Sequence, residues 1–166
     1  ARAALMLVLL GLVGLAAWGM RRGWRTAAAR QRHLPAPPAR PALTGAALLG
    51  PLEAIYASTT PAGQWLSRLV VHDLGVRSPA TVTVTDDGVL LDRVGAASFM
   101  VPTTALRGVG VRGGIAGATP GRHAVVVLTW QLGDPADPQA LLVDTGVQPR
   151  RAVDRDRLVD TLRTLL

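Results

Sequence analysis

Few side chains in this sequence have the types and spacing that catalysis or metal binding requires. His72 and Asp73, close to Arg68, have the composition of an acid/base pair, but neighbouring residues rarely form a site and a histidine at a strand end usually provides polar cover. The three histidines are scattered along the chain without the spacing of metal ligands. The chain has no cysteine, which excludes disulfides, thiolate metal sites and cysteine nucleophiles. We therefore predict no catalytic residue and no metal site.

Residues 108–113 (GVGVRG) match the glycine pattern of dinucleotide-binding turns. That pattern binds a cofactor when a strand precedes it and a helix opens at its third glycine. Four residues that oppose such a helix follow it: Gly114, Gly117, Pro120 and Gly121. We predict a glycine-rich strand or turn here and no cofactor.

Three acids, Asp86, Asp87 and Asp92, cluster around a predicted hairpin. A calcium-binding loop needs acids in a D-x-D-x-D-G pattern, which is absent here. Turn formation and solubility account for these acids.

The net charge of +7 is confined to one part of the chain. Residues 1–40 hold seven arginines and no acid, whereas residues 41–166 hold eleven arginines and all eleven acids. The second part is therefore neutral, and its only tryptophans are Trp65 and Trp130. It lacks both the basic surface and the stacking platform that nucleic-acid binding requires, so we predict no nucleic-acid partner.

The longest apolar stretch of the sequence precedes most of these arginines. Residues 3–20 (AALMLVLLGLVGLAAWGM) hold no charge and no proline, and a run of this length is typical of a transmembrane helix. We predict a transmembrane helix over residues 1–20 that contacts the lipid bilayer through residues 3–20. Tryptophan and arginine favour the headgroup region. The residues expected at the membrane interface are Trp18, Arg21, Arg22, Trp24 and Arg25.

The charge on either side of this segment predicts its orientation. Only Arg2 precedes it, while a basic juxtamembrane segment follows over residues 21–34. The positive-inside rule places the N-terminus outside and residues 21–166 in the cytoplasm, so the expected location is the cell membrane. The arginines from Arg21 to Arg32 could also attract anionic lipid headgroups, and simple topology-setting charge is the alternative.

Two other interpretations of the apolar segment compete with the anchor. A signal peptide has its basic region before a shorter apolar core and a small-residue cleavage site after it, whereas here the charge bias is reversed and the run is longer. The other interpretation is the core helix of a soluble protein. The anchor is favoured over both.

Residues 35–51 (PAPPARPALTGAALLGP) contain five prolines. A proline-rich segment is extended and semi-rigid, so we predict a linker here, followed by a domain over residues 52–166. A ligand for proline-binding domains is the alternative interpretation of the same prolines.

The domain has the turn and alternation pattern of a β-protein. The predicted strands cover residues 52–59, 80–85, 89–93, 98–101, 106–112, 124–131 and 140–145, and residues 65–72 form a second apolar segment after the first of them. The clearest signal is a hairpin, in which ATVTVT is followed by an Asp-Asp-Gly turn. We expect Val82 and Val84 to face the core and the threonines beside them to face outward. Residues 124–131 are expected to form the best-buried strand.

A helix is predicted over residues 154–166, with Asp154 as its N-cap and one apolar stripe formed by Leu158, Leu162 and Leu165. About seven short strands followed by one such helix indicate a small barrel whose open end the helix plugs. This is the plan of a pleckstrin-homology-like (PH-like) domain. The predicted fold is therefore a mainly β, PH-like split barrel, capped by a C-terminal helix and preceded by one transmembrane helix.

Several segments also resemble a known family. They are Tyr56–Thr60 (YASTT), Trp65–Gly75, Ala80–Gly88, the pair Thr129 and Trp130, and Leu142–Gly146 (LVDTG). They are similar to segments of uncharacterised single-pass membrane proteins of actinobacteria with a PH-like domain, often labelled hypothetical, transporter or export proteins and often encoded beside pyrimidine-biosynthesis enzymes. The resemblance implies a fold and a lineage, and it supplies no mechanism.

Members of the PH-like superfamily that bind phosphoinositides carry basic residues in the first hairpin loop. The matching loop, taken as Thr60–Gln64, has none, so headgroup binding by the domain is not expected. We expect a non-enzymatic, single-pass membrane protein whose cytoplasmic PH-like domain acts as a scaffold or docking module for a protein partner. Two alternatives stay open, an accessory subunit of a larger transport or export complex and a ligand-binding or enzymatic domain.

Overall fold

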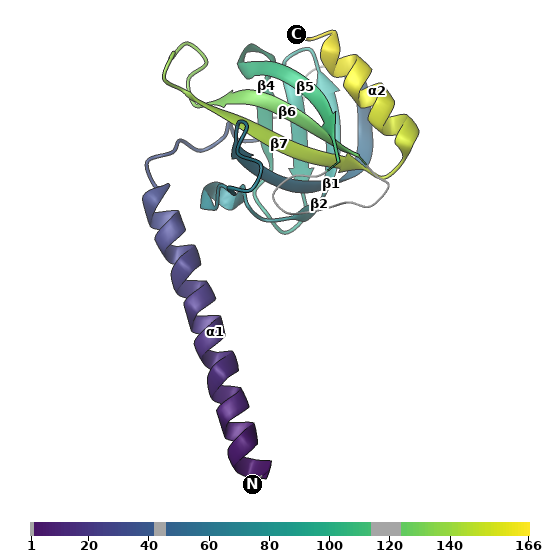
Figure 1. Cartoon of the computed structure of the whole chain (residues 1–166). Coiled ribbons are helices and arrows are strands. Elements are labelled where there is room, and N and C mark those ends of the chain that lie inside the picture. Colours follow the sequence, from purple (N-terminus) through teal and green to yellow (C-terminus); the bar gives the residue numbers. More distant parts are fainter. Residues whose placement is uncertain (1, 42–45, 114–123) are drawn as a thin grey trace. The chain divides into compact units, whose positions relative to one another are not determined.

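The computed structural model of the chain describes residues 2–41, 46–113 and 124–166 (Figure 1). The chain divides into two compact units, residues 1–33 and Leu34–Leu166. The first unit is a single helix, α1 (Arg2–Arg30), which has no buried residue and is long and apolar enough to cross a membrane. It contains the predicted span and continues through most of the basic juxtamembrane segment.

The second unit is a seven-stranded antiparallel sheet in the order β4-β3-β2-β1-β7-β6-β5. Its strands are β1 (Leu49–Pro61), β2 (Ser78–Thr85), β3 (Gly88–Arg93), β4 (Phe99–Pro102), β5 (Leu106–Arg112), β6 (Val125–Leu132) and β7 (Leu141–Pro149). Two 3-10 turns, η1 (Val71–Asp73) and η2 (Thr103–Ala105), lie in the connections, and α2 (Ala152–Arg163) follows β7. The mainly β barrel with a C-terminal helix is confirmed.

The long strand β1 bends the sheet into a barrel. Its first part pairs with β2, and its second part pairs with β7, with a register shift between Tyr56 and Ser58. A bulge of this kind increases the local twist and redirects the strand. One strand therefore belongs to both halves of the split barrel.

The barrel is filled by aromatic and aliphatic side chains. The ring of Phe99 stacks on Trp130 at 6.1 Å and meets the edge of Tyr56 at 6.0 Å. Leu158 and Leu162 of α2 are fully buried in the same core, as the predicted stripe requires. β6 buries nearly all of its side chains, as expected for the strand with the strongest β propensity.

The predicted hairpin is present, but its outward threonines are not exposed. Val82 and Val84 lie in the core as predicted, whereas Thr83 and Thr85 are also buried. The backbone at the start of β1 lies close to this part of the hairpin: the Leu48 amide donates to the Val84 carbonyl, and a Cβ at Gly50 would lie 3.1 Å from the Cα of Thr83. The prediction for these threonines was wrong because it treated one face of the hairpin as solvent-exposed.

The second apolar segment, residues 65–72, does not form a strand. The segment belongs to a long loop between β1 and β2, in which Trp65 and Leu66 are exposed while Leu69 is buried. The Leu69 amide donates to the Thr59 carbonyl, and the Thr59 amide donates to the Leu74 carbonyl. These tertiary hydrogen bonds fold the segment back onto β1, so its local β propensity is overridden.

The compact unit begins at Leu34, before the predicted domain boundary at residue 52. Residues 34–41, which we call the strap, lie along the edge of β4. The Met100 amide donates to the Pro38 carbonyl, and Ala39 forms an isolated bridge with Phe99. A proline-rich segment can line a sheet edge because its carbonyls still accept hydrogen bonds. This part of the predicted linker is thus packed on the barrel.

The start of the C-terminal helix also differs from the prediction. α2 begins at Ala152, and its N-cap is Arg151. Asp154 therefore lies in the first turn, where it is buried and accepts two hydrogen bonds from the Arg151 side chain. A carboxylate in this position still complements the positive end of the helix dipole.

Candidate functional site

The predicted interface residues lie near the C-terminal end of α1. Trp18, Arg21, Arg22 and Arg25 share one face of the helix, because their spacing follows the helical period. The Arg22 guanidinium lies 5.4 Å from the centroid of the Trp18 ring, within cation–π range. Trp24 projects from a different face. This arrangement is suited to a headgroup region, where tryptophan and arginine can pair with lipid polar groups.

The loop between β1 and β2 is the largest irregular segment described in the barrel. It covers residues 62–77, and both His72 and Asp73 have positive φ, 53° and 59°. Residues other than glycine hold this conformation only when their surroundings fix it. The His72 Nε2 lies 2.9 Å from the Leu34 carbonyl oxygen, and the Asp73 carboxylate accepts the Ala97 amide at 3.2 Å. Both residues thus fix the loop, to the strap and to the β3–β4 connection.

A chain of buried hydrogen bonds anchors the same loop to the core. The Trp130 Nε1 donates to the Thr145 hydroxyl at 2.9 Å, and that hydroxyl lies 2.7 Å from the Thr59 hydroxyl. The Thr59 hydroxyl lies 2.6 Å from the Tyr56 hydroxyl, which donates to the Leu74 carbonyl at 2.7 Å. The indole only donates and the carbonyl only accepts, so the three hydroxyl protons all point toward the loop.

These hydrogen-bonded hydroxyls have a structural role, because they anchor the loop to the core. Burial raises the pKa of the Tyr56 phenol well above its usual range, although the Thr59 hydrogen bond and the Arg93 charge act in the opposite direction. A phenol held in its neutral form is a stable donor to the Leu74 carbonyl. Four of the segments that carry the family resemblance meet here, since they supply Tyr56, Leu74, Trp130 and Thr145.

Arg93 is the one buried arginine among the described residues of the barrel. Its guanidinium lies over the Tyr56 ring at 3.9 Å. It donates to the Ser78 hydroxyl and to the carbonyls of Asp73, Val76 and Ala97. Burial lowers the pKa of this guanidinium, while Tyr56 and Asp73 act in the opposite direction.

The sequence did not indicate that Arg93 is buried or that Trp65 and Leu66 are exposed. Arg93 ends a correctly predicted strand, and nothing in a lone arginine at a strand end indicates burial. The exposure of Trp65 and Leu66 has no signal in the sequence, because adjacent large apolar residues also occur in buried strands such as β3 and β6.

The first hairpin loop is longer than the predicted Thr60–Gln64. The loop extends beyond Gln64 to Arg77, and it contains Arg68 and Arg77 in addition to His72 and Asp73. The statement that the first hairpin loop has no basic residue was therefore wrong. Its charges are nevertheless mixed, and the neighbouring β6–β7 loop adds Asp134 and Asp137 without a basic residue.

The remaining motifs have structural roles. The described part of the glycine pattern, through Gly113, forms β5 and the residue after it, and the residues that follow lie outside the described chain. Asp86 and Asp87 form the hairpin turn, while Asp92 pairs with Arg40 of the strap at 3.0 Å. Among the described residues there is no group of three or more metal-ligating side chains.

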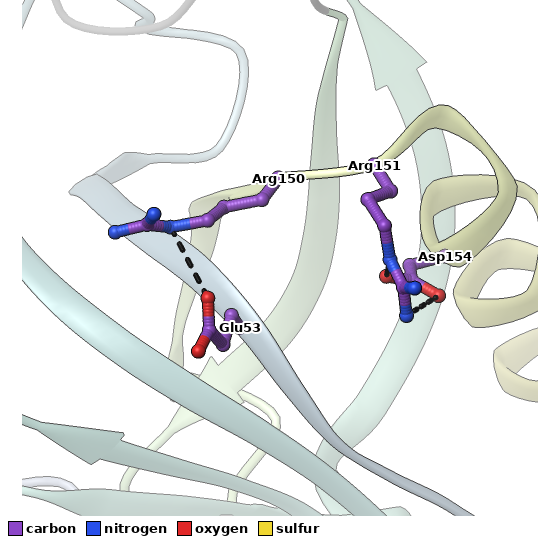
Figure 2. Close-up of polar contacts among 4 residues, drawn as sticks. All are labelled: Glu53, Arg150, Arg151 and Asp154. Carbon is purple, nitrogen blue, oxygen red and sulfur yellow. Dashed lines mark hydrogen bonds and ion pairs between the residues drawn. The ribbon is translucent and has the colours of Figure 1, made fainter.

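A polar pocket of about 440 Å³ lies where β1 begins and β7 meets α2. Figure 2 shows its four charged residues: Glu53, Arg150, Arg151 and Asp154. The Arg150 Nε lies 3.5 Å from the Glu53 carboxylate, and the Arg151 Nε lies 2.7 Å from the Asp154 carboxylate. The hydrogen bonds and charge of Asp154 raise the pKa of Arg151. Each arginine has its own carboxylate, so the pocket is electroneutral.

The split barrel, its shared strand β1 and the helix that closes it define a PH-like domain, and the chain carries this domain directly after an apolar helix. The chain belongs to the family described as bacterial PH domain-like, whose model matches residues 34–163. The match begins where the compact unit begins and therefore includes the strap. Among curated proteins and among solved structures, no match to the chain was found.

Proposed function

We propose that this protein is a single-pass, membrane-anchored and non-catalytic docking protein whose PH-like domain presents a strand edge to a protein partner. Residues 3–20 cross the bilayer in this proposal, and Trp18 to Arg25 lie at its cytoplasmic interface. An apolar helix long enough to span and a family of PH-like domains, which are typically non-catalytic, support the proposal. The arginines that follow the span support a cytoplasmic domain.

The observation that carries the docking role is the difference between the two edge strands. The strap covers β4 through Pro38 and Ala39. β5 is the other edge of the sheet, and no described residue forms a backbone pair with its outer side. An uncovered edge offers unpaired amides and carbonyls to an extended segment of another chain. α2 packs against β5, so the helix flank adjoins this edge.

Site-specific photocrosslinking in intact membranes tests this role. A crosslinking amino acid replaces Val111 on β5, and the matched control replaces Leu48, which has a similar exposed fraction of 49% against 46%. We expect one discrete adduct from position 111 and none from position 48. A third position, Val153 on α2, separates docking through the helix flank from docking through the strand edge. No adduct from position 111, or the same adducts from all three positions, would contradict the proposal.

An exchange of the anchor separates docking from the accessory-subunit alternative. Residues 3–20 are replaced by an unrelated spanning helix of the same length, and crosslinking from position 111 is repeated. A docking domain keeps its adduct, because the partner contacts the barrel. Loss of the adduct would favour an accessory subunit that uses the apolar helix as its interface.

A further inference from the structure

Leu34, the first residue of the second unit, lies at one end of the barrel, and β7 meets α2 at the opposite end. We call the first the proximal end; it contains the β1–β2 loop (residues 62–77), the β3–β4 loop (94–98) and the β6–β7 loop (133–140). Leu34 belongs to the proximal end, because its carbonyl contacts His72, and Pro35 lies against Gly133. We call the opposite end the distal end; it contains the charged pocket of Figure 2.

The proximal end carries two adjacent exposed apolar side chains. Trp65 is 51% exposed and Leu66 is 68% exposed, in a turn that immediately follows β1. Leu142 is also exposed, and its carbonyl accepts the Ala62 amide at 2.9 Å, which places it beside this turn. Single exposed apolar residues are ordinary, but an exposed tryptophan next to an exposed leucine forms an apolar patch of the kind found at membrane or protein contact sites.

The loop that carries these residues is held in place. Leu69 and Leu74 are buried on either side of η1. In the second half of the loop, Tyr56 donates to the Leu74 carbonyl and Arg93 donates to the Val76 carbonyl. The Gln64 amide donates to the Pro61 carbonyl, and the Ser67 amide donates to the Gln64 carbonyl. The exposed side chains thus project from a fixed backbone, so their burial would cost little ordering entropy.

The covalent chain limits where the proximal end can be. Leu34 follows the last residue of α1 by four positions, which span at most about 14 Å. The ten residues of α1 beyond the predicted span add about 15 Å. If the span crosses the bilayer, Leu34 stays within about 30 Å of the hydrocarbon core. The tether therefore keeps the proximal end at a high effective concentration near the membrane surface.

We propose that Trp65 and Leu66 insert into the membrane interface, so that the proximal end of the barrel faces the bilayer. Tryptophan favours the level of the headgroups, and leucine favours the acyl boundary beneath it. The loop charges are mixed, with Arg68 and Arg77 opposed by Asp73, Asp134 and Asp137. Insertion therefore depends on apolar contact and is independent of anionic lipid. The β5 edge stays available for the proposed partner. This inference rests on the proposed membrane anchor.

Depth measurements on the full chain in vesicles test the insertion. The chain has no native cysteine, so single cysteines can carry an environment-sensitive fluorophore at chosen positions. Leu66→Cys reports on the loop, Leu10→Cys on the anchor, and Val153→Cys on the distal end; Leu66 and Val153 are both exposed apolar residues. The vesicles consist of zwitterionic phosphatidylcholine with nitroxide groups at shallow or deep positions of the acyl chain.

We expect the label at position 66 to be quenched several-fold more than the label at position 153, and most strongly by the shallow nitroxide. Phosphatidylglycerol or high salt should leave this quenching unchanged. A label at position 66 that behaves like the label at position 153 overturns the insertion, even if an added protein later buries it. If position 10 is quenched while position 66 is not, the anchor stands and the insertion fails. If position 10 is not quenched either, the proposed anchor fails and the insertion with it.

Discussion

The two ends of the barrel hold their loops by different means. At the proximal end two buried side chains, Arg93 and Tyr56, donate hydrogen bonds to loop carbonyls, and the Leu74 carbonyl that Tyr56 reaches belongs to a fully buried residue. At the distal end Arg150 and Arg151 are exposed, and their carboxylate partners neutralise them one by one. Buried polar groups are costly to disrupt, whereas exposed ion pairs contribute little. Substitutions in the buried groups at the proximal end should therefore lower stability more than substitutions of the exposed arginines at the distal end.

Removal of Arg93 should produce the largest difference between the two ends. Arg93→Ala removes one donor from each of three loop carbonyls and from the Ser78 hydroxyl, and it removes the guanidinium that packs over the Tyr56 ring, so we expect the free energy of unfolding to fall by roughly 3 kcal/mol. Urea denaturation of the full chain in detergent measures it. The control is Arg77→Ala in the same loop, an exposed arginine whose loss should change stability by less than about 0.5 kcal/mol. Equal effects of the two substitutions would remove the distinction.

Removal of the Tyr56 hydroxyl should have the next largest effect. Tyr56→Phe keeps the ring in the core but removes the acceptor of the Thr59 hydroxyl proton and one of the two donors to the Leu74 carbonyl. We expect a loss of about 2 kcal/mol in urea denaturation, because the buried Thr59 hydroxyl proton is left without an acceptor. The matched control removes an exposed hydroxyl, Thr164→Val, and should cost a fraction of that. An unchanged free energy of unfolding in Tyr56→Phe would show that the loop does not depend on the buried hydroxyls.

The same phenol predicts how stability depends on pH. Its folded pKa lies above the unfolded value of about 10, so its contribution is complete below that pH. Above about pH 10 the unfolded chain releases the proton that the folded chain retains, and stability should fall by up to about 1.4 kcal/mol per pH unit. Tyr56 is the only tyrosine, so the ultraviolet absorbance of tyrosinate follows it alone. Titration of the folded protein near pH 10, or the same fall in Tyr56→Phe, would contradict the account.

The smallest effect is expected at the distal end. Arg150 and Glu53 are mostly exposed and 3.5 Å apart, so Arg150→Ala should lower stability by less than about 0.5 kcal/mol. High salt should abolish even this difference, because it screens exposed charges. Urea denaturation at low and high ionic strength gives both values. A loss above about 1 kcal/mol would show that the two ends are held in the same way.

The regular parts of the fold could be predicted because they follow local rules. The hairpin at Ala80–Arg93 has alternation and a turn, and the α2 stripe has the helical period, so each carries its signal within a few residues. The number of strands and the terminal helix were then enough to predict a PH-like barrel. The apolar segment was equally clear, because length and composition alone identify it.

The parts that failed depend on contacts between distant residues. Residues 65–72 have strand-like composition, but the hydrogen bonds of Leu69 to β1 decide their conformation. The strap has the composition of a spacer, but a free edge at β4 accepts it. Arg93 has no local signal, since its partners come from loops up to 20 positions away. No pattern read along the chain contains these pairings.

The central claim is that residues 3–20 hold a PH-like domain at the membrane. Leu9 and Val153 are apolar and almost equally exposed, at 52% and 50%, so arginine at either position would be tolerated in water. In a bilayer, Leu9→Arg places a charge in the hydrocarbon core at a cost of roughly 3 kcal/mol. Alkaline extraction of membranes should release Leu9→Arg more readily than the unaltered chain, while Val153→Arg stays in the membrane. Equal retention of the two variants would contradict the anchor.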